Sequence, residues 1–138
     1  MPSYRPRLTV TLPPEWLVKE SITVLAPDGY ANVIASSEPL DLEISVEKYA
    51  TVQGELLRTE FPDFQELDFG QTTVFGDKTG FMRRYQWRAP DKGMVSQVQI
   101  YYAADGRGYT ATATVPSGEL SRYEQVLFEI IAGLQIIS

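Results

Sequence analysis

Residues 70–116 alternate between apolar and polar side chains with the period of two that is typical of β-strands. Turns rich in glycine and aspartate interrupt this alternation at residues 76–80, 90–93 and 105–108. Short turns of this composition join antiparallel neighbours. The pattern therefore predicts an antiparallel meander, with strands over roughly residues 64–75, 80–89, 94–104 and 108–115, the first of them broken or bulged near Gly70.

The first part of the chain predicts three more strands. They cover residues 7–12, 18–26 and 30–36, and the turn Pro27-Asp28-Gly29 joins the last two. The double proline at residues 13–14 ends the first strand. Trp16 follows this corner and is expected to fold back over an end of the core.

Two segments have the helical period of 3.6. Residues 45–59 place apolar side chains on one stripe, with Ser45 as N-cap, and Gly54 indicates close packing against the sheet. Residues 119–132 form the second predicted helix, capped by Ser117 or Ser121. Residues 134–137 are expected to add a short final strand. Together the elements predict one α+β domain over residues 1–138: an antiparallel sheet of roughly six to eight strands with two main helices.

Alternation also assigns the two faces of the meander. One face carries large apolar side chains and is predicted to be core: Phe81, Tyr85, Trp87, Val98, Ile100, Tyr102, Tyr109, Ala111, Ala113 and Val115. The other is predicted to be a flat polar surface that contacts a partner through hydrogen bonds and the apolar stems of long side chains. Its partner-binding residues are Arg84, Gln86, Arg88, Gln97, Gln99, Tyr101, Thr110 and Thr112. Coverage of this face by a helix, or by solvent alone, is the alternative.

Composition removes most common catalytic classes. The 138 residues include no cysteine and no histidine, which excludes thiol nucleophiles, thiolate metal sites, disulfides and imidazole chemistry. The net charge of −6 is spread without long runs and argues against nucleic acid as the main partner. No apolar stretch is long enough to enter a membrane, and the N-terminal residues lack the apolar core of a signal peptide, so a cytoplasmic location is expected.

The charged residues do not form a pattern typical of an active site. Residues 38–43 bring three carboxylates together without the spaced Asp, Asn and Gly of a calcium loop, and they are expected to serve the following helix terminus. Four more carboxylates between residues 60 and 68 fall at a helix end and a strand start. Arg83 lies in the core register, so it is expected at a strand end or paired with a carboxylate. We predict no catalytic residues, no metal and no cofactor.

Several segments, in this order, resemble the DcrB/PsbP-like family, whose fold is shared with the Ran-binding protein Mog. They are residues 12–16, 31–34, 45–49, 80–88 and 109–113, and the last helix with Phe128 and Ile131. The resemblance implies a compact α/β/α sandwich used as a binding scaffold. The family includes Eag-type chaperones of type VI secretion, which hold hydrophobic segments of toxins before export.

The first functional hypothesis is accordingly a non-enzymatic cytosolic chaperone or adaptor for a hydrophobic or secreted protein, such as an effector. A second is a small-ligand-binding or enzymatic domain that uses a carboxylate in a pocket between the helix at 45–59 and the sheet. A third is a structural subunit whose sheet face or edge strand is buried in a homodimer.

Overall fold

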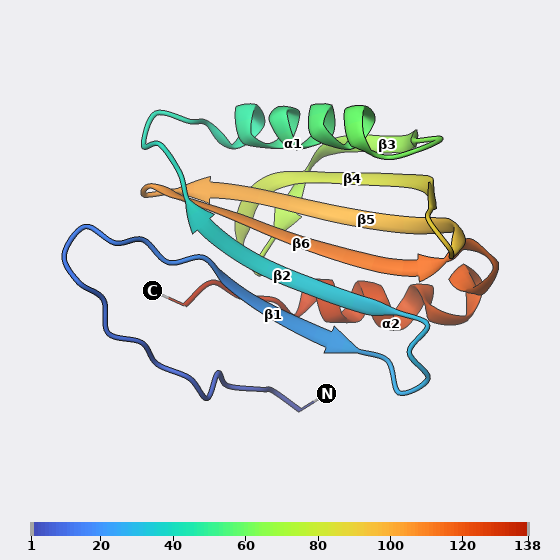
Figure 1. Cartoon of the computed structure of the whole chain (residues 1–138), viewed down its shortest axis with the longest axis horizontal. Coiled ribbons are helices and arrows are strands. Elements are labelled where there is room, and N and C mark those ends of the chain that lie inside the picture. The colour runs from blue at the N-terminus through green and yellow to red at the C-terminus, as the bar shows by residue number, and fades with distance from the viewer. Residues whose placement is uncertain (1, 138) are drawn as a thin grey trace.

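The computed structural model describes residues 2–137 as an antiparallel sheet with one helix on each face (Figure 1). The strands are β1 (Glu20–Leu25), β2 (Asn32–Pro39), β3 (Gln65–Val74), β4 (Lys78–Ala89), β5 (Gly93–Ala104) and β6 (Arg107–Pro116). The helices are α1 (Val46–Glu60) and α2 (Leu120–Ala132), and a 3-10 turn at Ser117–Glu119 leads into α2. The six strands follow the order β1-β2-β6-β5-β4-β3. The predicted α+β class, with this sheet and two main helices, is confirmed.

Two predicted strands at the ends of the chain are absent from the described residues. Residues 2–19 precede β1 without joining the sheet, and residues 134–137 follow α2 without forming a strand. Trp16 is 71% exposed, so its predicted packing over the core is wrong. Alternation makes a segment competent to pair as a strand but does not determine whether it joins the sheet, so the pattern alone could not decide these two predictions.

Helix α1 packs on β4 and β5, on what we call the α1 face of the sheet. Ser45 caps its first turn as predicted, since its side chain accepts a hydrogen bond from the Lys48 amide at 3.0 Å. Tyr49 and Ala50 are buried against Tyr101 and Ala103 of β5. These contacts form the smaller of two apolar clusters.

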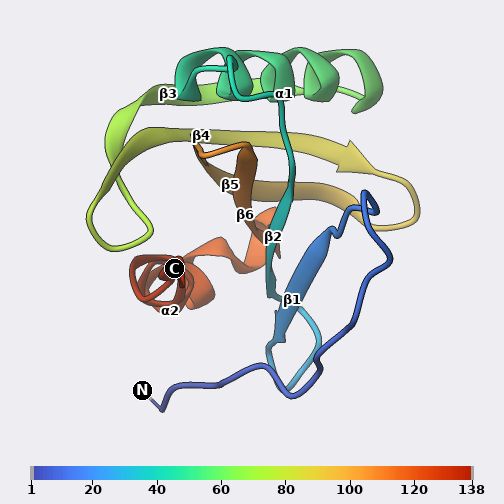
Figure 2. The same cartoon turned by 90° about the vertical axis from the view of Figure 1, so that its left-hand side faces the viewer.

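Helix α2 lies against β6 and β2 on the opposite side, the α2 face (Figure 2). Leu127 and Ile131 are buried in the larger cluster, together with Val33 of β2 and Ala111 of β6. The predicted serine caps are wrong, because the N-cap position is Glu119 and no side chain bonds to the first turn. The helix ends at Gly133, whose amide bonds back to the carbonyls of the last turn.

The strand register changes the predicted assignment of faces. Phe81 of β4 lies opposite Tyr101, and Arg84 lies opposite Val98. The apolar residues of β4 therefore share a face with the polar residues of β5, and the reverse holds on the other side. The physical reason is that α1 covers the β4–β5 region on one face while α2 covers the β2–β6 region on the other. Apolar residues thus switch faces in the middle of the sheet.

Candidate binding groove

A groove runs between α2 and the edge of the sheet formed by β3 and β4, on the α2 face. Because α2 packs mainly on β6 and β2, the strands β4 and β3 extend beyond it. Two adjoining pockets occupy this space, and both are lined by Phe128 and Ile131 of α2. The helix therefore forms one wall along the whole groove.

The first pocket has a small volume of about 40 Å³ and an apolar lining. Val98 and Ala113 contribute from the sheet, and Leu120 and Leu127 contribute from α2. Leu67 of β3 closes the outer side. These apolar side chains favour an apolar group of a bound molecule over a polar one, because they offer a polar group no hydrogen-bond partner.

The second pocket has a volume of about 270 Å³ and lies further along α2. Thr72, Val74 and Met82 line it from the sheet, opposite Ala132 at the end of the helix. Residues 120–132 of α2 span about 18 Å at 1.5 Å per residue, which sets the scale of the groove. Side chains one helical turn apart on a bound segment would reach both pockets.

A β-bulge in β3 supplies the outer wall. The register with β4 shifts between Glu66 and Asp68, so Leu67 has no partner in the ladder. The shift keeps both Glu66 and Phe69 in contact with Arg83 on the α1 face, while Leu67 turns to the groove. The sequence prediction placed the irregularity near Gly70, and the structure moves it to Leu67.

Charged residues also line the groove. Arg84 of β4 and Glu124 of α2 both line the first pocket, and Asp68 lies opposite Arg84 in the strand register. Within residues 2–137, Arg84 takes part in none of the side-chain hydrogen bonds or ion pairs found. The first pocket therefore offers both signs of charge beside its apolar side chains.

The predicted partner-binding residues do not form one surface. Arg84, Gln86 and Arg88 point to the α2 face, and Gln97, Gln99, Tyr101, Thr110 and Thr112 point to the α1 face. Of the first group only Arg84 lines the groove. Gln86 instead bonds to Gln65 at 2.8 Å, and Arg88 bonds to Asp63 at 2.9 Å. The prediction that these residues share one face is wrong.

The residues on the α1 face bond to one another across three strands. Gln97 Oε1 accepts from the Trp87 indole at 3.0 Å, and its Nε2 donates to Thr114 at 2.8 Å. In the next row the Tyr101 hydroxyl donates to Gln99, whose Nε2 donates to Thr112 at 3.1 Å. Thr110 lies within hydrogen-bond distance of Ser36, at 3.2 Å. These polar groups are therefore engaged in stabilising the sheet.

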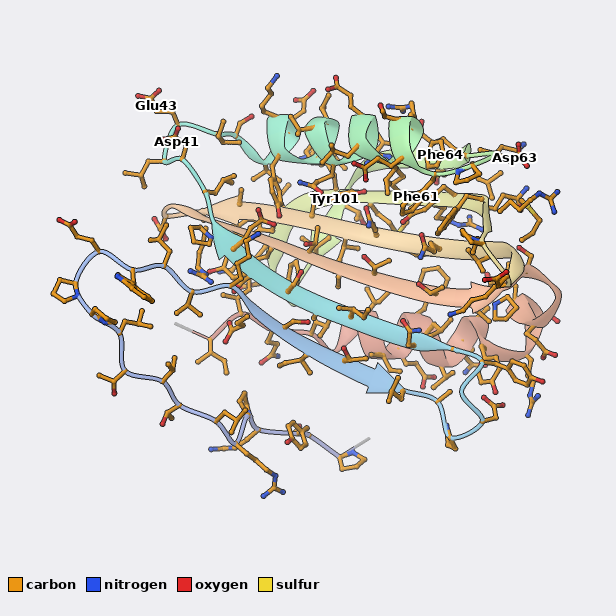
Figure 3. All side chains as sticks on the ribbon, in the orientation of Figure 1. Asp41, Glu43, Phe61, Asp63, Phe64 and Tyr101 are labelled. Carbon is orange, nitrogen blue, oxygen red and sulfur yellow. The ribbon has the colours of Figure 1, made fainter. Side chains whose placement is uncertain are left out.

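Arg83 continues this network beneath α1. Its Nε donates to Glu66 at 2.8 Å, and its Nη1 donates to the Tyr101 hydroxyl at 2.7 Å and to the Ala50 carbonyl at 3.2 Å. Figure 3 labels Tyr101 in the layer between α1 and the sheet, where it is fully buried. The predicted pairing of Arg83 with a carboxylate is confirmed, and the partner is Glu66.

The space beneath α1 is packed, in contrast to the pocket proposed there by the second sequence hypothesis. Arg83 and Tyr101 fill it, and a Cβ added to Gly54 would overlap the Arg83 guanidinium. Burial raises the pKa of Tyr101 to about 12, and burial raises the pKa of Tyr49 to the same value. Both hydroxyls are protonated at neutral pH, so neither is poised as a general base.

Tyr85 shares this face and has a buried hydroxyl. Burial raises the pKa of Tyr85 far above its ordinary value, and its ring lies 5.3 Å from that of Phe64. Its hydroxyl has no hydrogen-bond partner among the described residues. The ring supplies packing area next to the end of α1, where Phe61 also stacks on Trp87 at 3.8 Å.

The acidic loop before α1 stands apart from the groove. Figure 3 shows Asp41 and Glu43 at the outer end of this loop. Glu38, at the end of β2, accepts a hydrogen bond from the Tyr49 hydroxyl at 3.4 Å. Within residues 2–137 no three acidic side chains gather in an arrangement that could hold a metal ion.

Sequence reasoning missed Phe128, Glu124 and Leu67 as groove residues. The sequence does contain a signal for Phe128. Adjacent apolar pairs such as Leu127-Phe128 and Ile130-Ile131 make the apolar stripe of α2 wider than contact with the core alone requires. Leu67 carries no comparable signal, since its direction depends on the bulge.

Comparison with solved structures defines the fold. Protein PA94 of Pseudomonas aeruginosa, of unknown function and described as a candidate regulator, is 15% identical; the match covers 92% of this chain and 90% of that one, with a TM-score of 0.74. The cyanobacterial PsbP (CyanoP) of Synechocystis is 7% identical over 85% of this chain and 82% of its own, with a TM-score of 0.62. The fold is PsbP-like.

A third structure with this PsbP-like fold is LpqN of Mycobacterium tuberculosis, which is involved in cell envelope biogenesis. It is 17% identical over 78% of this chain and 62% of its own, with a TM-score of 0.57. No family model matches the sequence. No curated protein matches it either. The PsbP part of the family resemblance is thus supported at the level of the fold, and the DcrB part stays a prediction.

Among the described residues, neither helix has the length and apolar character needed to cross a membrane.

Proposed function

We propose that this chain is a non-enzymatic binding domain that holds an apolar segment of a protein partner in the groove between α2 and β3–β4, as a chaperone or adaptor does. The observation that supports it is the pair of adjoining apolar pockets along one side of α2. The proposal includes a cytoplasmic location and a single domain over the chain.

The chemistry of the groove favours the apolar face of an amphipathic helix. The first pocket is lined by α2 residues from Leu120 to Ile131 and the second by residues from Phe128 to Ala132, so the midpoints of the two stretches lie about one helical turn apart. Apolar side chains at positions i and i+4 of a partner helix have the same spacing. Arg84 and Glu124, which line the first pocket, would then contact the polar flanks of that helix.

Site-specific photo-crosslinking in cells of the native host tests this function. A benzophenone amino acid replaces Phe128 in the groove, or Leu56 in the matched control, since Leu56 is 47% exposed on α1 and lies outside the groove. We expect a protein adduct at position 128 and not at position 56. Mass spectrometry should identify the attached peptide as an amphipathic segment with apolar residues one helical turn apart.

The same experiment can contradict the proposal. Equal adducts at the two positions, a polar attached peptide, or a lipid adduct at position 128 would each overturn it. The variant Leu67→Ser removes an apolar side chain from the wall of the first pocket and should lower the yield of a specific adduct at position 128.

A further inference from the structure

Residues 2–19 form an exposed arm ahead of the sheet. Leu8, Val10 and Leu12 are 92%, 70% and 42% exposed, and they alternate with Thr9 and Thr11. This is the pattern of a strand with one apolar and one polar face, yet the segment pairs with no strand. The arm thus has the side chains of a β-strand and lacks a neighbour.

The first strand of the sheet is a free edge. β1 pairs with β2 on one side only, and β1 and β3 are the two edges of the sheet. Ile22 and Val24 are each 41% exposed on this edge, and Leu25 is 70% exposed. Backbone N–H and C=O groups on an uncovered edge accept an added strand.

The alternation of the arm matches that of the edge. On β1, Ile22 and Val24 lie on the α2 face, next to Ala35 and Val33 of β2. Ser21 and Thr23 lie on the α1 face. An added strand with the sequence of residues 8–12 would continue both rows, with its leucines and valine beside the apolar row and its threonines beside the polar one.

The arm leaves the sheet at a fixed point next to β1 in the described conformation. Arg107 Nη2 donates to the Val18 carbonyl at 2.6 Å, which fixes the point where the arm departs. Pro13 and Pro14 follow the alternating residues, and the Trp16 amide closes a turn onto the Pro13 carbonyl at 3.3 Å. Figures 1 and 2 both show the arm standing apart from β1 of its own chain.

We infer that residues 8–12 of one molecule pair with the free edge of β1 in a second molecule, and the reverse, giving a symmetric strand-exchanged dimer. The connection at residues 13–19 is longer than the usual hairpin loop of two to five residues. Reciprocal exchange pairs the β1 edge of each molecule with the arm of the other, which gives a closed two-fold dimer. The groove lies toward β3, at the other edge of the sheet, so this inference does not depend on the proposed function.

The chain lacks cysteine, so single engineered cysteines report pairing without interference. Copies carrying Thr11→Cys are mixed with differently tagged copies carrying Thr23→Cys under mild oxidation. We expect a mixed disulfide dimer, and we expect none when the second copy carries Thr51→Cys on the exposed side of α1. The double variant Thr11→Cys/Thr23→Cys tests whether the arm folds onto its own edge. If oxidation gives a monomer with an intrachain disulfide, the inference is overturned.

Light scattering at micromolar concentration provides the second measurement. The unmodified chain should be a dimer. Val10→Pro removes a backbone donor in the middle of the arm strand and should give a monomer with an unchanged circular dichroism spectrum. Ser3→Pro, in the same arm but outside the alternating residues, should leave the dimer intact. A monomeric parent chain, or a dimer that survives Val10→Pro, would also overturn the inference.

Discussion

The Arg83 guanidinium lies directly against Gly54 of α1, in the place that a Cβ on residue 54 would occupy. Three acceptors hold Arg83 there: the Glu66 carboxylate, the Tyr101 hydroxyl and the Ala50 carbonyl. The arginine therefore has little freedom to move aside. The close approach of α1 to the sheet depends on this pair of residues.

Gly54→Ala should destabilise the protein, although alanine favours helices over glycine by about 1 kcal/mol. The added methyl group overlaps a fixed guanidinium, and overpacking of this kind costs about 1–3 kcal/mol. We expect a net loss of about 1 kcal/mol in the free energy of unfolding, measured in urea. Thr51→Ala, on the exposed side of α1, is the control and should not destabilise. In an Arg83→Met background the cost should shrink, and an undiminished cost would refute the contact.

Two carboxylate–arginine pairs with similar N–O distances should contribute differently to stability. Glu66 lies 2.8 Å from Arg83, whose side chain is 2% exposed, whereas Asp63 lies 2.9 Å from Arg88, whose side chain is 60% exposed. Glu66→Gln leaves a charge buried without its counterion. It should cost about 1–3 kcal/mol, less than for a fully enclosed pair because Glu66 is itself 30% exposed.

Asp63→Asn is the matched control for this comparison. Its pair is solvent-exposed, so the loss should stay below about 1 kcal/mol. Urea unfolding at neutral pH measures both variants. Equal losses would contradict the view that burial sets the strength of the Arg83 pair.

The sequence predicted the features that depend on local signals. The alternation and turns of residues 70–116 indicated the meander, and Ser45 and Gly54 indicated the start and the close packing of α1. Arg83 was expected to require a carboxylate because a charge in a core register is costly when unpaired. Each of these inferences needs only a residue and its neighbours in the chain.

The candidate groove could not be predicted, because it depends on long-range placement. Alternation fixes which residues of one strand share a face, but the pairing of Arg84 with Val98 sets which faces of β4 and β5 coincide. The groove further requires α2 to cover β6 and β2 and to leave β4 free. The bulge that turns Leu67 toward α2 has no signature in the residues beside it.

The buried tyrosines predict a loss of stability at alkaline pH. Their pKa values are raised in the folded state, to about 12 for Tyr49 and Tyr101, from an ordinary value of 10.0. The unfolded chain therefore releases these protons first as the pH rises. Stability that is present below pH 10 is lost progressively up to about pH 12, with a slope of at most about 1.4 kcal/mol per pH unit for each tyrosine.

Tyr101→Phe tests this pH dependence. It keeps the ring and removes the titrating hydroxyl, so its stability should fall less between about pH 9 and about pH 11 than that of the parent chain. Stability near neutral pH should be lower, because Arg83 loses an acceptor. The same decline for Tyr101→Phe and the parent would contradict the prediction, and Tyr30→Phe, at a tyrosine that is 52% exposed, is the control.

Leu67 and Leu56 provide a direct test of the groove in the isolated protein. The two leucines are 51% and 47% exposed, yet only Leu67 lines the first pocket. N-phenylnaphthylamine is a neutral apolar dye that fluoresces on leaving water, and we expect it to bind the parent chain. Leu67→Ser removes part of the contact area and should weaken binding by roughly 3–10-fold, since burying a whole leucine side chain contributes about 1.5–3 kcal/mol. Leu56→Ser makes the same chemical change on α1 and should leave the affinity as it is. Equal weakening by both substitutions would mean that the dye reports general surface hydrophobicity, and unchanged binding by Leu67→Ser would exclude the first pocket as its site.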